Sequence, residues 1–404
     1  MTAYDVIVAG GGPAGLSAAA VAARAGLATL VLERNAAIGV PVRTSGGSWI
    51  DELTVLGVPA RFFVPMHRIR VIAPHAEAVF DYREPRMCVL DVRSFLQWLA
   101  QEAIAAGARI HLRTRADSVL ENAGRVSGVR VREADGRMAE IVAGSVIDAT
   151  GYASTLARRQ RLHDGFAAFG VGAELDLYAP HWNENEAALI VGKNVAPSGY
   201  AWVLPYGQGR VRLGVGIGRP HSDADPGAYL EYVRERVLAL AILRDASPIE
   251  AHAGVVPMAL PRSVPLVRAK LVVAGDAAAQ ASALVGEGIR YAMHAGRLAA
   301  DAVIAAQRTD DYSDRAYERY PAAWRRRERN LRFAFEIYRR IVAFDDADWD
   351  REIAQLTRLS PDQFAQGLKG DFTLRWLMAI APRYAGMLVP ARLRTLVGRT
   401  AAPA

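Results

Sequence analysis

The 404-residue sequence has little cysteine: Cys88 is its single member. One cysteine excludes an internal disulfide and any zinc or iron–sulfur site built from several cysteines, and it fits a reducing compartment. The eight histidines form no pair at the i, i+3 or i, i+4 spacing of helical metal ligands. We therefore predict no metal site and assign no histidine a catalytic role.

Long uninterrupted apolar runs are also missing. No stretch of about twenty uncharged apolar residues is present, so we expect no transmembrane helix. The apolar segment 10–32 lacks a basic region before it and contains Arg24, which is unlike a signal peptide. We expect a cytoplasmic protein, with peripheral attachment to a membrane left open.

Lysine is scarce although the chain is basic. The formal net charge is +7, with 49 basic and 42 acidic residues, yet lysine occurs only at positions 193, 270 and 369. The arginines are spread along the chain instead of forming one stripe, which is typical of a compositional bias. We predict no nucleic-acid partner.

The N-terminal segment has the pattern of a dinucleotide-binding βαβ unit. A strand-like run over 4–9 precedes GGGPAG at 10–15, an alanine-rich helix follows, and a second strand over 28–32 ends at Glu33. Gly10 permits the tight turn, Gly12 lets the backbone approach a pyrophosphate, and Gly15 lets helix and strand pack closely. Glu33 can accept hydrogen bonds from ribose hydroxyls. The motif does not separate FAD from NAD, although its place near residue 1 favours FAD; a glycine-rich structural turn is the alternative.

A second candidate segment lies at residues 271–289. A short strand over 271–274 is followed by GDAA at 275–278, GEGI at 286–289 and a helix-like stretch over 290–305. Asp276 can accept a hydrogen bond from a ribityl hydroxyl, and backbone amides at the helix start can face the pyrimidine edge of a flavin. An ordinary turn with a helix cap is the alternative.

These motifs resemble the FAD-dependent oxidoreductases of the glutathione-reductase-2 type, which include aromatic hydroxylases, flavin-dependent halogenases and geranylgeranyl reductases. The middle element DATG at 148–151 resembles their third FAD contact, and Arg93 matches an arginine on a helix beside the flavin. The resemblance implies FAD as cofactor, with contacts at Gly10, Gly12, Pro13, Ala14, Gly15, Glu33, Arg34, Arg43, Arg93, Gly151, Gly275, Asp276, Gly286, Gly288 and Ile289.

Three further stretches resemble the geranylgeranyl reductase family. They are PVR at 41–43, YAWVLP at 200–205, similar to a Y-x-W-x-F-P motif that lines the substrate cavity, and GLKGDF at 367–372. This chain has Thr44 where the family often has cysteine, and Leu204 where an aromatic residue is usual. From the resemblance we predict Tyr200, Trp202 and Thr44 as catalytic-site residues that line the substrate cavity beside the flavin. Tyr200 is a candidate proton donor, although a phenol with a pKa of about 10 needs help from its surroundings. Tyr200 and Trp202 share one face of a predicted strand, as cavity wall or as ordinary sheet core.

The predicted fold class is α/β: a discontinuous Rossmann-like FAD-binding domain, an α+β substrate domain on an antiparallel sheet, and a C-terminal helical region. The first domain covers 1–60, 90–160 and 265–308, the second 61–89 and 161–264, and the third 309–404. In the third, residues 324–344 interleave arginine with apolar residues. This pattern is typical of a helix packed on the protein, or of one on an anionic membrane surface.

The resemblance implies an FAD-dependent enzyme that reduces carbon–carbon double bonds of an isoprenoid or other hydrophobic substrate. No second complete G-x-G-x-x-G unit is present, so we expect an external electron donor, NAD(P)H or a reduced carrier. The alternative is a monooxygenase acting on an aromatic or polyketide-like molecule. Halogenation is disfavoured because no lysine precedes Lys193. The sequence does not specify an oligomeric state.

Overall fold

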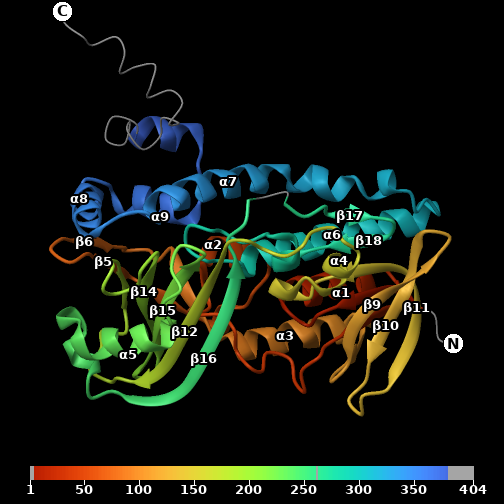
Figure 1. The fold of residues 1–404 in the computed structure, drawn as a ribbon, viewed down its shortest axis with the longest axis horizontal. Coiled ribbons are helices and arrows are strands. Elements are labelled where there is room, and N and C mark those ends of the chain that lie inside the picture. The colour runs from red at the N-terminus through yellow and green to blue at the C-terminus, as the bar shows by residue number, and fades with distance from the viewer. Residues whose placement is uncertain (1–3, 261–262, 381–404) are drawn as a thin grey trace, which may run out of the picture.

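The computed structural model describes residues 4–260 and 263–380. It contains a mixed sheet with helices on it, a second sheet beside the first, a small third sheet, and a set of C-terminal helices (Figure 1). In Figure 1 the first sheet occupies one half of the molecule and the second sheet the other, while the long helix α7 (Arg319–Ile341) runs across both.

The first sheet is the Rossmann-like layer. Its main strand order is β17-β18-β11-β1-β2-β8, and every neighbouring pair is parallel except β17–β18. The hairpin β9–β10 extends β11 in antiparallel fashion. The strand bounds are β1 Tyr4–Ala9, β2 Thr29–Leu32, β8 Arg109–His111, β9 Arg115–Asn122, β10 Arg125–Arg132, β11 Met138–Asp148, β17 Val267–Arg268 and β18 Leu271–Val273.

Helices α1 (Pro13–Arg24), α3 (Val92–Ala105) and α6 (Ile289–Thr309) pack together on this layer. Helix α1 is rich in alanine, which lets its neighbours approach closely. A Cβ built at Gly296 of α6 would lie 2.0 Å from the carbonyl oxygen of Ala14, so only glycine permits this contact. The close packing sets the start of α1 against the first turns of α6.

The second sheet has the order β16-β12-β15-β14-β13-β5-β6. All its pairs are antiparallel except β13–β5. The bounds are β5 Arg68–Ile72, β6 Glu77–Asp81, β12 Phe169–Tyr178, β13 Glu186–Ile190, β14 Gly199–Gly207, β15 Arg210–Arg219 and β16 Ser247–Pro257. Helix α5 (Pro226–Arg236) packs against one face, and the opposite face turns toward the first sheet's cavity.

The third sheet and two short helices connect these layers. Its order is β3-β7-β4, with β3 Gly47–Trp49, β4 Phe63–Met66 and β7 Met87–Leu90, all antiparallel. Helix α2 spans Ile50–Val55 and helix α4 spans Thr155–Arg159.

The C-terminal helices are α7, α8 (Asp346–Leu356) and α9 (Pro361–Lys369). Capping boxes at Asp345 and Ser360 start α8 and α9. In α7 the apolar side chains Tyr320, Trp324, Leu331 and Tyr338 are buried within the protein. The apolar face of this arginine-rich helix is therefore used for packing. Residues 381–404 of the predicted helical region lie outside the described residues.

The predicted fold class is confirmed: a parallel Rossmann-like layer, an antiparallel second sheet and a helical C-terminal part. No helix in the described part of the chain is long and apolar enough to cross a bilayer.

Candidate flavin and substrate site

The GGGPAG turn joins β1 to α1. Gly10 has φ +115°, and a Cβ there would lie 2.1 Å from the carbonyl oxygen of Ala149. At Gly15 a Cβ would lie 1.9 Å from the carbonyl oxygen of Gly10, so this residue lets helix and strand pack. A Cβ at Gly12 would meet nothing within 4 Å. Because α1 has no side-chain cap, its first N–H groups are available to an anion.

Glu33 fixes the turn from the end of β2. One carboxylate oxygen, Oε2, accepts from the N–H of Gly11 at 2.8 Å, and Oε1 accepts from the N–H of Asn35 at 2.8 Å. Each carboxylate oxygen has lone pairs beyond these bonds. Glu33 also borders the cavity, which leaves it placed to accept from ribose hydroxyls.

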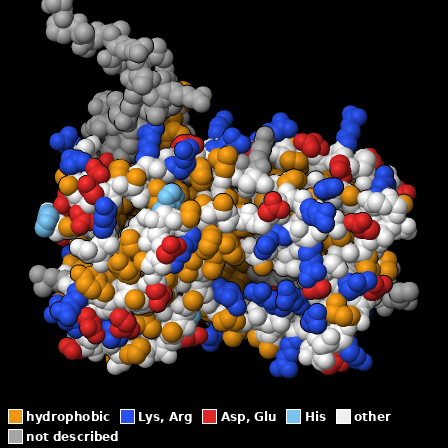
Figure 2. Space-filling model, in the orientation of Figure 1, with side chains coloured by type: hydrophobic (Ala, Val, Ile, Leu, Met, Phe, Trp, Pro, Cys, Tyr) orange, Lys and Arg blue, Asp and Glu red, His pale blue; other side chains and the backbone are white. Residues whose placement is uncertain are grey.

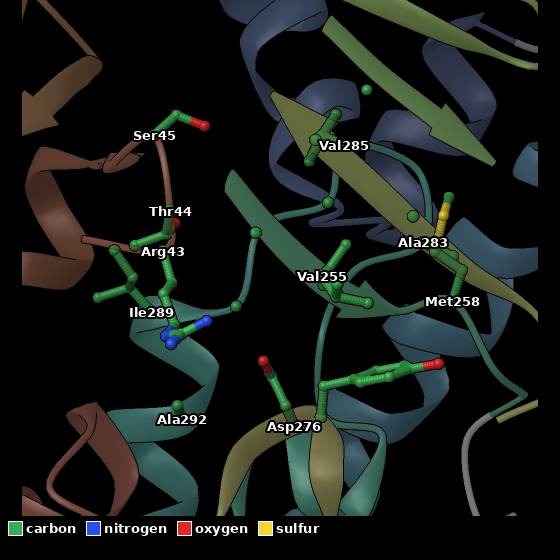
Figure 3. A pocket seen from close by; sticks show the side chains of 18 of the residues that line it. Arg43, Thr44, Ser45, Val255, Met258, Asp276, Ala283, Val285, Ile289 and Ala292 are labelled. Atoms are coloured by element: carbon green, nitrogen blue, oxygen red, sulfur yellow. The ribbon is translucent and has the colours of Figure 1, made fainter. Parts of the chain in front are cut away.

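Asp276 and the GEGI segment form the opposite part of the site. Asp276 lies in a short turn, Gly275–Ala278, directly after β18. Burial raises the pKa of its carboxyl to about 6. Helix α6 begins at Ile289 with Gly288 before it and no side-chain cap. Figure 3 shows Asp276 pointing into the open space that Ile289 and Ala292 border.

The two segments meet at one cavity of about 820 Å³. Among the predicted cofactor residues, its lining includes Gly10, Gly12, Pro13, Ala14, Glu33, Arg34, Arg43, Gly151, Gly275, Asp276, Gly286, Gly288 and Ile289. The residues predicted to contact substrate, Thr44, Tyr200 and Trp202, line it as well. Segments separated by more than two hundred residues in sequence therefore converge, as one elongated ligand requires. Figure 2 shows hydrophobic side chains around a hollow in the middle of one face, with basic side chains beside it.

Two predicted residues do not line this cavity. Gly15 packs α1 on the sheet, as described above. Arg93, at the start of α3, donates from NH2 to Glu250 of β16 at 3.0 Å, and both side chains are more than two-fifths exposed. This ion pair joins the helix to the second sheet.

The loop 43–45 lies between the two sheets. A Cβ at Gly254 of β16 would lie 2.2 Å from the carbonyl oxygen of Arg43, so the loop backbone rests directly on the second sheet. From the same sheet, Arg212 of β15 donates from Nη1 to the carbonyl oxygens of Ser45 at 2.9 Å and Thr44 at 3.3 Å. Figure 3 shows this loop along one side of the cavity, with Val255 and Met258 across from it.

Tyr200 and Trp202 face the cavity from β14. Their ring centroids are 5.3 Å apart, and the Trp202 ring lies over Gly214 and Gly216 of β15. Gly214 and Gly216 thus make room for the Trp202 ring. The hydroxyl of Tyr200 donates to the carbonyl oxygen of Val285 at 2.7 Å, and burial raises its pKa far above the ordinary value. A phenol in that state is a poor proton donor.

Sequence reasoning missed a cluster of charged residues on the cavity face of the second sheet. Arg212 is 1% exposed and donates to both carboxylate oxygens of Asp176, at 2.6 and 2.9 Å. His252 Nε2 lies 3.1 Å from Asp176 Oδ2. Burial tends to raise the pKa of Asp176, but hydrogen bonds from Arg212 and His252 outweigh it and bring the pKa to about 2. Glu174, also buried, lies two residues away on the same strand face.

Three ligand-type side chains, Asp176, Glu250 and His252, come within 4.8 Å of one another here. Arg212 occupies both oxygens of Asp176, so the arrangement is an ion-pair network. Strand-like segments with charges at alternate positions are typical of solvent-facing strands. The alternating charges of these strands therefore favour an exposed face and not a buried cluster.

The far wall of the cavity is apolar and comes from the C-terminal helices. Its lining side chains include Phe333, Ile337, Ile341, Trp349, Ile353, Leu356, Phe364, Leu368, Phe372 and Trp376. The GLKGDF stretch is tied to the GEGI segment, because Arg290 NH2 donates to the carbonyl oxygen of Lys369 at 2.6 Å. Arg290 Nε also donates to both carboxylate oxygens of Glu287. Glu352 is an acid in this apolar wall, and burial raises its pKa to about 7.

Comparison with known proteins matches this architecture. Residues 5–160 match the FAD dependent oxidoreductase family, and residues 172–256 match the geranylgeranyl reductase catalytic domain. A digeranylgeranylglycerophospholipid reductase of Methanothermobacter thermautotrophicus is 34% identical over 342 residues, covering 82% of this chain and 86% of that protein. The chain belongs to the geranylgeranyl reductase family of FAD-dependent oxidoreductases. A second family member, the digeranylgeranylglycerophospholipid reductase of Methanoculleus marisnigri, is 32% identical and covers 90% of this chain and 92% of that protein.

Solved structures place this geranylgeranyl reductase family member in the same fold. A geranylgeranyl bacteriochlorophyll reductase-like protein of Thermoplasma acidophilum has a TM-score of 0.86 and 25% identity, covering 96% of this chain and 98% of that one. A flavin-dependent brominase has a TM-score of 0.70 at 17% identity, covering 91% and 94%, which shows a shared fold alone. The predicted family and the FAD cofactor are confirmed.

The cavity of this oxidoreductase fits FAD. The uncapped starts of α1 and α6 present N–H groups, and Glu33 and Asp276 present carboxylates for hydroxyl groups. Bound flavin supplies hydride or electron transfer at its ring system. The protein binds and orients the flavin and provides an apolar cavity that excludes water.

Proposed function

We propose that this enzyme reduces carbon–carbon double bonds of an isoprenoid chain, using FAD that an external donor has reduced. The observation that carries the proposal is the apolar chamber, continuous with the flavin site and walled by α7, α8 and α9. A chain of saturated and unsaturated carbons fits such a wall, because apolar contact is its main means of binding. The relatives named as digeranylgeranylglycerophospholipid reductases support the same substrate class.

The flavin contacts in this proposal follow from the placement of the two segments. The start of α1, at Gly12, holds the pyrophosphate through backbone N–H groups and the helix dipole. Glu33 accepts from the adenosine ribose and Asp276 from the ribityl chain. The start of α6 at Gly288 and Ile289 faces the pyrimidine edge of the flavin, and in the view of Figure 3 the Arg43 side chain extends toward Ile289.

Substrate contacts in this proposal come from the face of the second sheet. Trp202 and Tyr200 form an aromatic wall of two tilted rings, and Thr44 lies on the loop that Arg212 holds. This wall orients the double bond beside the flavin while the C-terminal helices hold the rest of the chain.

The electron donor and any membrane contact also stay predictions. NAD(P)H or a reduced carrier would dock transiently. Because the apolar side chains of α7 pack inward, an anionic membrane would meet the exposed arginines of this helix, such as Arg325 and Arg329. Sedimentation with anionic and with neutral vesicles tests this contact.

The function is tested with the purified, FAD-loaded protein under anaerobic conditions. Flavin reduced by dithionite should be reoxidised by geranylgeranyl diphosphate, with product mass rising by two hydrogens for each double bond reduced. A fully saturated diphosphate of the same chain length is the matched control and should leave the flavin reduced. Reoxidation that requires oxygen and an aromatic compound would instead identify a monooxygenase.

A further inference from the structure

Glu174 is a buried acid on the cavity wall to which none of the motifs points. It lies on β12, opposite Gly214 of β15 and His252 of β16. The residue is 5% exposed and borders the cavity. Its Oε1 is buried and has no hydrogen-bond partner among the described residues. Leaving a buried carboxylate oxygen without a hydrogen bond costs free energy. The cost is avoided if the Glu174 carboxyl holds a proton or binds a ligand in the cavity.

A second unpaired atom lies in the same row of the sheet. Trp202 of β14 is opposite Gly214, which is opposite Glu174. The indole Nε1 of Trp202 is buried without a partner among the described residues, above the Cα of Gly214. A donor and an acceptor, each unpaired, thus occupy one strip of the wall proposed to contact the double bond.

The charged neighbours of Glu174 leave it able to hold a proton. Burial raises the pKa of its carboxyl, and Asp176 on the same strand raises it further, against the lowering effects of Arg212, Ser45 and His252. Arg212 is the strongest of these, yet it is committed to Asp176 through two hydrogen bonds. Burial of the carboxyl nevertheless outweighs the effect of Arg212, so the net shift of the Glu174 pKa is upward. Tyr200, on β14, is the remaining titratable group facing it.

The other acids of the described lining are placed for different tasks. Glu33 already accepts two backbone N–H groups beside the phosphate turn. Asp276 lies at the flavin segment after β18. Glu352 comes from α8, within the apolar C-terminal wall. Glu174 alone of these four lies on the second sheet, beside Trp202 and the loop that carries Thr44.

We propose that Glu174 is the general acid of the double-bond reduction, a step that rests on the function proposed above. The carbon–carbon π bond breaks, one carbon receives a hydride from the reduced flavin, and the other receives the proton of the Glu174 carboxyl. The alkene gains two electrons, the flavin loses them, and Glu174 is left as a carboxylate. Each turnover therefore requires one proton from solvent to restore the acid.

The neighbouring strand β16 carries a histidine beside this part of the wall. His252 is opposite Glu174, and its Nε2 contacts Asp176 at 3.1 Å. Its Nδ1 lies 3.9 Å from Oε1 of Glu250, which is 42% exposed at the surface. His252 therefore belongs to the ion-pair network around Asp176, and Glu174, which borders the cavity, is restored by a proton that enters through the cavity.

The first test measures the protonation state of the Glu174 carboxyl in the flavin-free protein. Infrared difference spectra of wild type minus Glu174→Gln at pH 7 should show a protonated carboxyl band that is missing from the variant. Exposed Glu140, which pairs with Arg130 on the surface, supplies the matched control Glu140→Gln, whose difference spectrum should lack that band. A Glu174→Gln difference showing only carboxylate bands overturns the proposal.

The second test uses the FAD-loaded protein. Glu174→Gln should bind flavin, accept electrons from dithionite and bind geranylgeranyl diphosphate as wild type does. Reoxidation by that substrate should slow by about 10²- to 10⁴-fold, the usual contribution of a general acid. Glu174→Asp should restore part of the rate, and the wild-type fall in rate at high pH should be absent from Glu174→Gln.

Two negative outcomes are distinguishable. If wild type and Glu174→Gln turn over the substrate equally, the acid is wrong while the proposed function stands. If wild type fails to reduce any polyprenyl compound, the proposed function is wrong and the assignment of its acid falls with it.

Discussion

Replacing Arg212 by methionine should destabilise the protein through the carboxylate it leaves behind. Methionine keeps much of the side-chain length and removes the guanidinium. The change deletes two hydrogen bonds to Asp176, two to the carbonyl oxygens of the 43–45 loop, and the contact with the Tyr206 ring at 4.5 Å. Asp176 then remains buried with His252 as its partner.

The expected loss is about 3–5 kcal/mol, the usual cost of removing one partner from a buried ion pair. Removing the orphaned charge as well should recover much of it, so Arg212→Met/Asp176→Asn should be more stable than Arg212→Met alone. Urea unfolding followed by circular dichroism at pH 7 measures both differences. FAD affinity should also fall in both variants, since the Thr44–Ser45 backbone loses its support.

The effect should depend on pH in a defined direction. In wild type the pKa of Asp176 is lowered to about 2, so its stabilising contribution is complete above its ordinary pKa of about 4 and disappears as pH falls through 2. Without Arg212 the carboxyl is protonated at higher pH, and the deficit of the variant should shrink on acidification from pH 7. A loss below about 1 kcal/mol, or a double variant no more stable than the single one, would refute the buried-pair argument.

Three further predictions concern the cavity. Gly214→Ala places a Cβ 2.3 Å from the Trp202 ring and should lower the free energy of unfolding by about 1–3 kcal/mol. The control Gly172→Ala, whose Cβ lies 3.7 Å from that ring, should leave it nearly unchanged. Urea unfolding of both variants measures the difference. Gly12→Ala should leave the flavin-free melting temperature unchanged, since its Cβ meets nothing within 4 Å, yet abolish retention of FAD absorbance on purification; normal FAD binding would contradict the pyrophosphate assignment. Because burial raises the pKa of Asp276 to about 6, the stability of the flavin-free protein should fall as pH rises from about 4 to 6. The melting temperature of Asp276→Asn, measured over the same pH range, should not show this fall. Identical profiles for the two proteins would contradict the assignment to Asp276.

Local motifs predicted the flavin half of the molecule well. The predicted strand at 4–9 coincides with β1, and the helix and second strand of the unit are present as α1 and β2. The stretch at 271–289 also forms the expected strand, turn and helix start. Such units carry their signal within about thirty residues, because strand, glycine turn and helix are neighbours in sequence.

The charged cluster could not be predicted in the same way. Asp176 and Arg212 lie 36 residues apart, and His252 lies 76 residues from Asp176. Only the sheet order places β15, β12 and β16 side by side, and the sequence specifies strands more clearly than their order. The partner of Arg93 in β16 was hidden for the same reason.

The arginine-rich C-terminal part carried a mixed signal. Its pattern allowed packing on the protein or contact with a membrane, and the structure shows that Tyr320, Trp324, Leu331 and Tyr338 pack inward. The contribution of α7, α8 and α9 to the chamber was visible only through the GLKGDF stretch. The sequence pattern of a C-terminal helix shows that it has an apolar face, but not which part of the protein that face packs against.

The tie between Arg290 and the Lys369 carbonyl has a consequence for engineering. Together with the contact between Arg327 of α7 and His294 of α6, it joins the C-terminal helices to the segment that begins at the predicted flavin site. Under the proposed function, the side chains of α8 and α9 that line the cavity would contact the far end of the substrate. Chain-length preference should therefore be adjustable by resizing positions such as Ile353 and Phe364, leaving the redox centre undisturbed. A chimera that takes α7, α8 and α9 from a relative should fold only if the hydrogen bond between Arg290 and the carbonyl of residue 369 is kept.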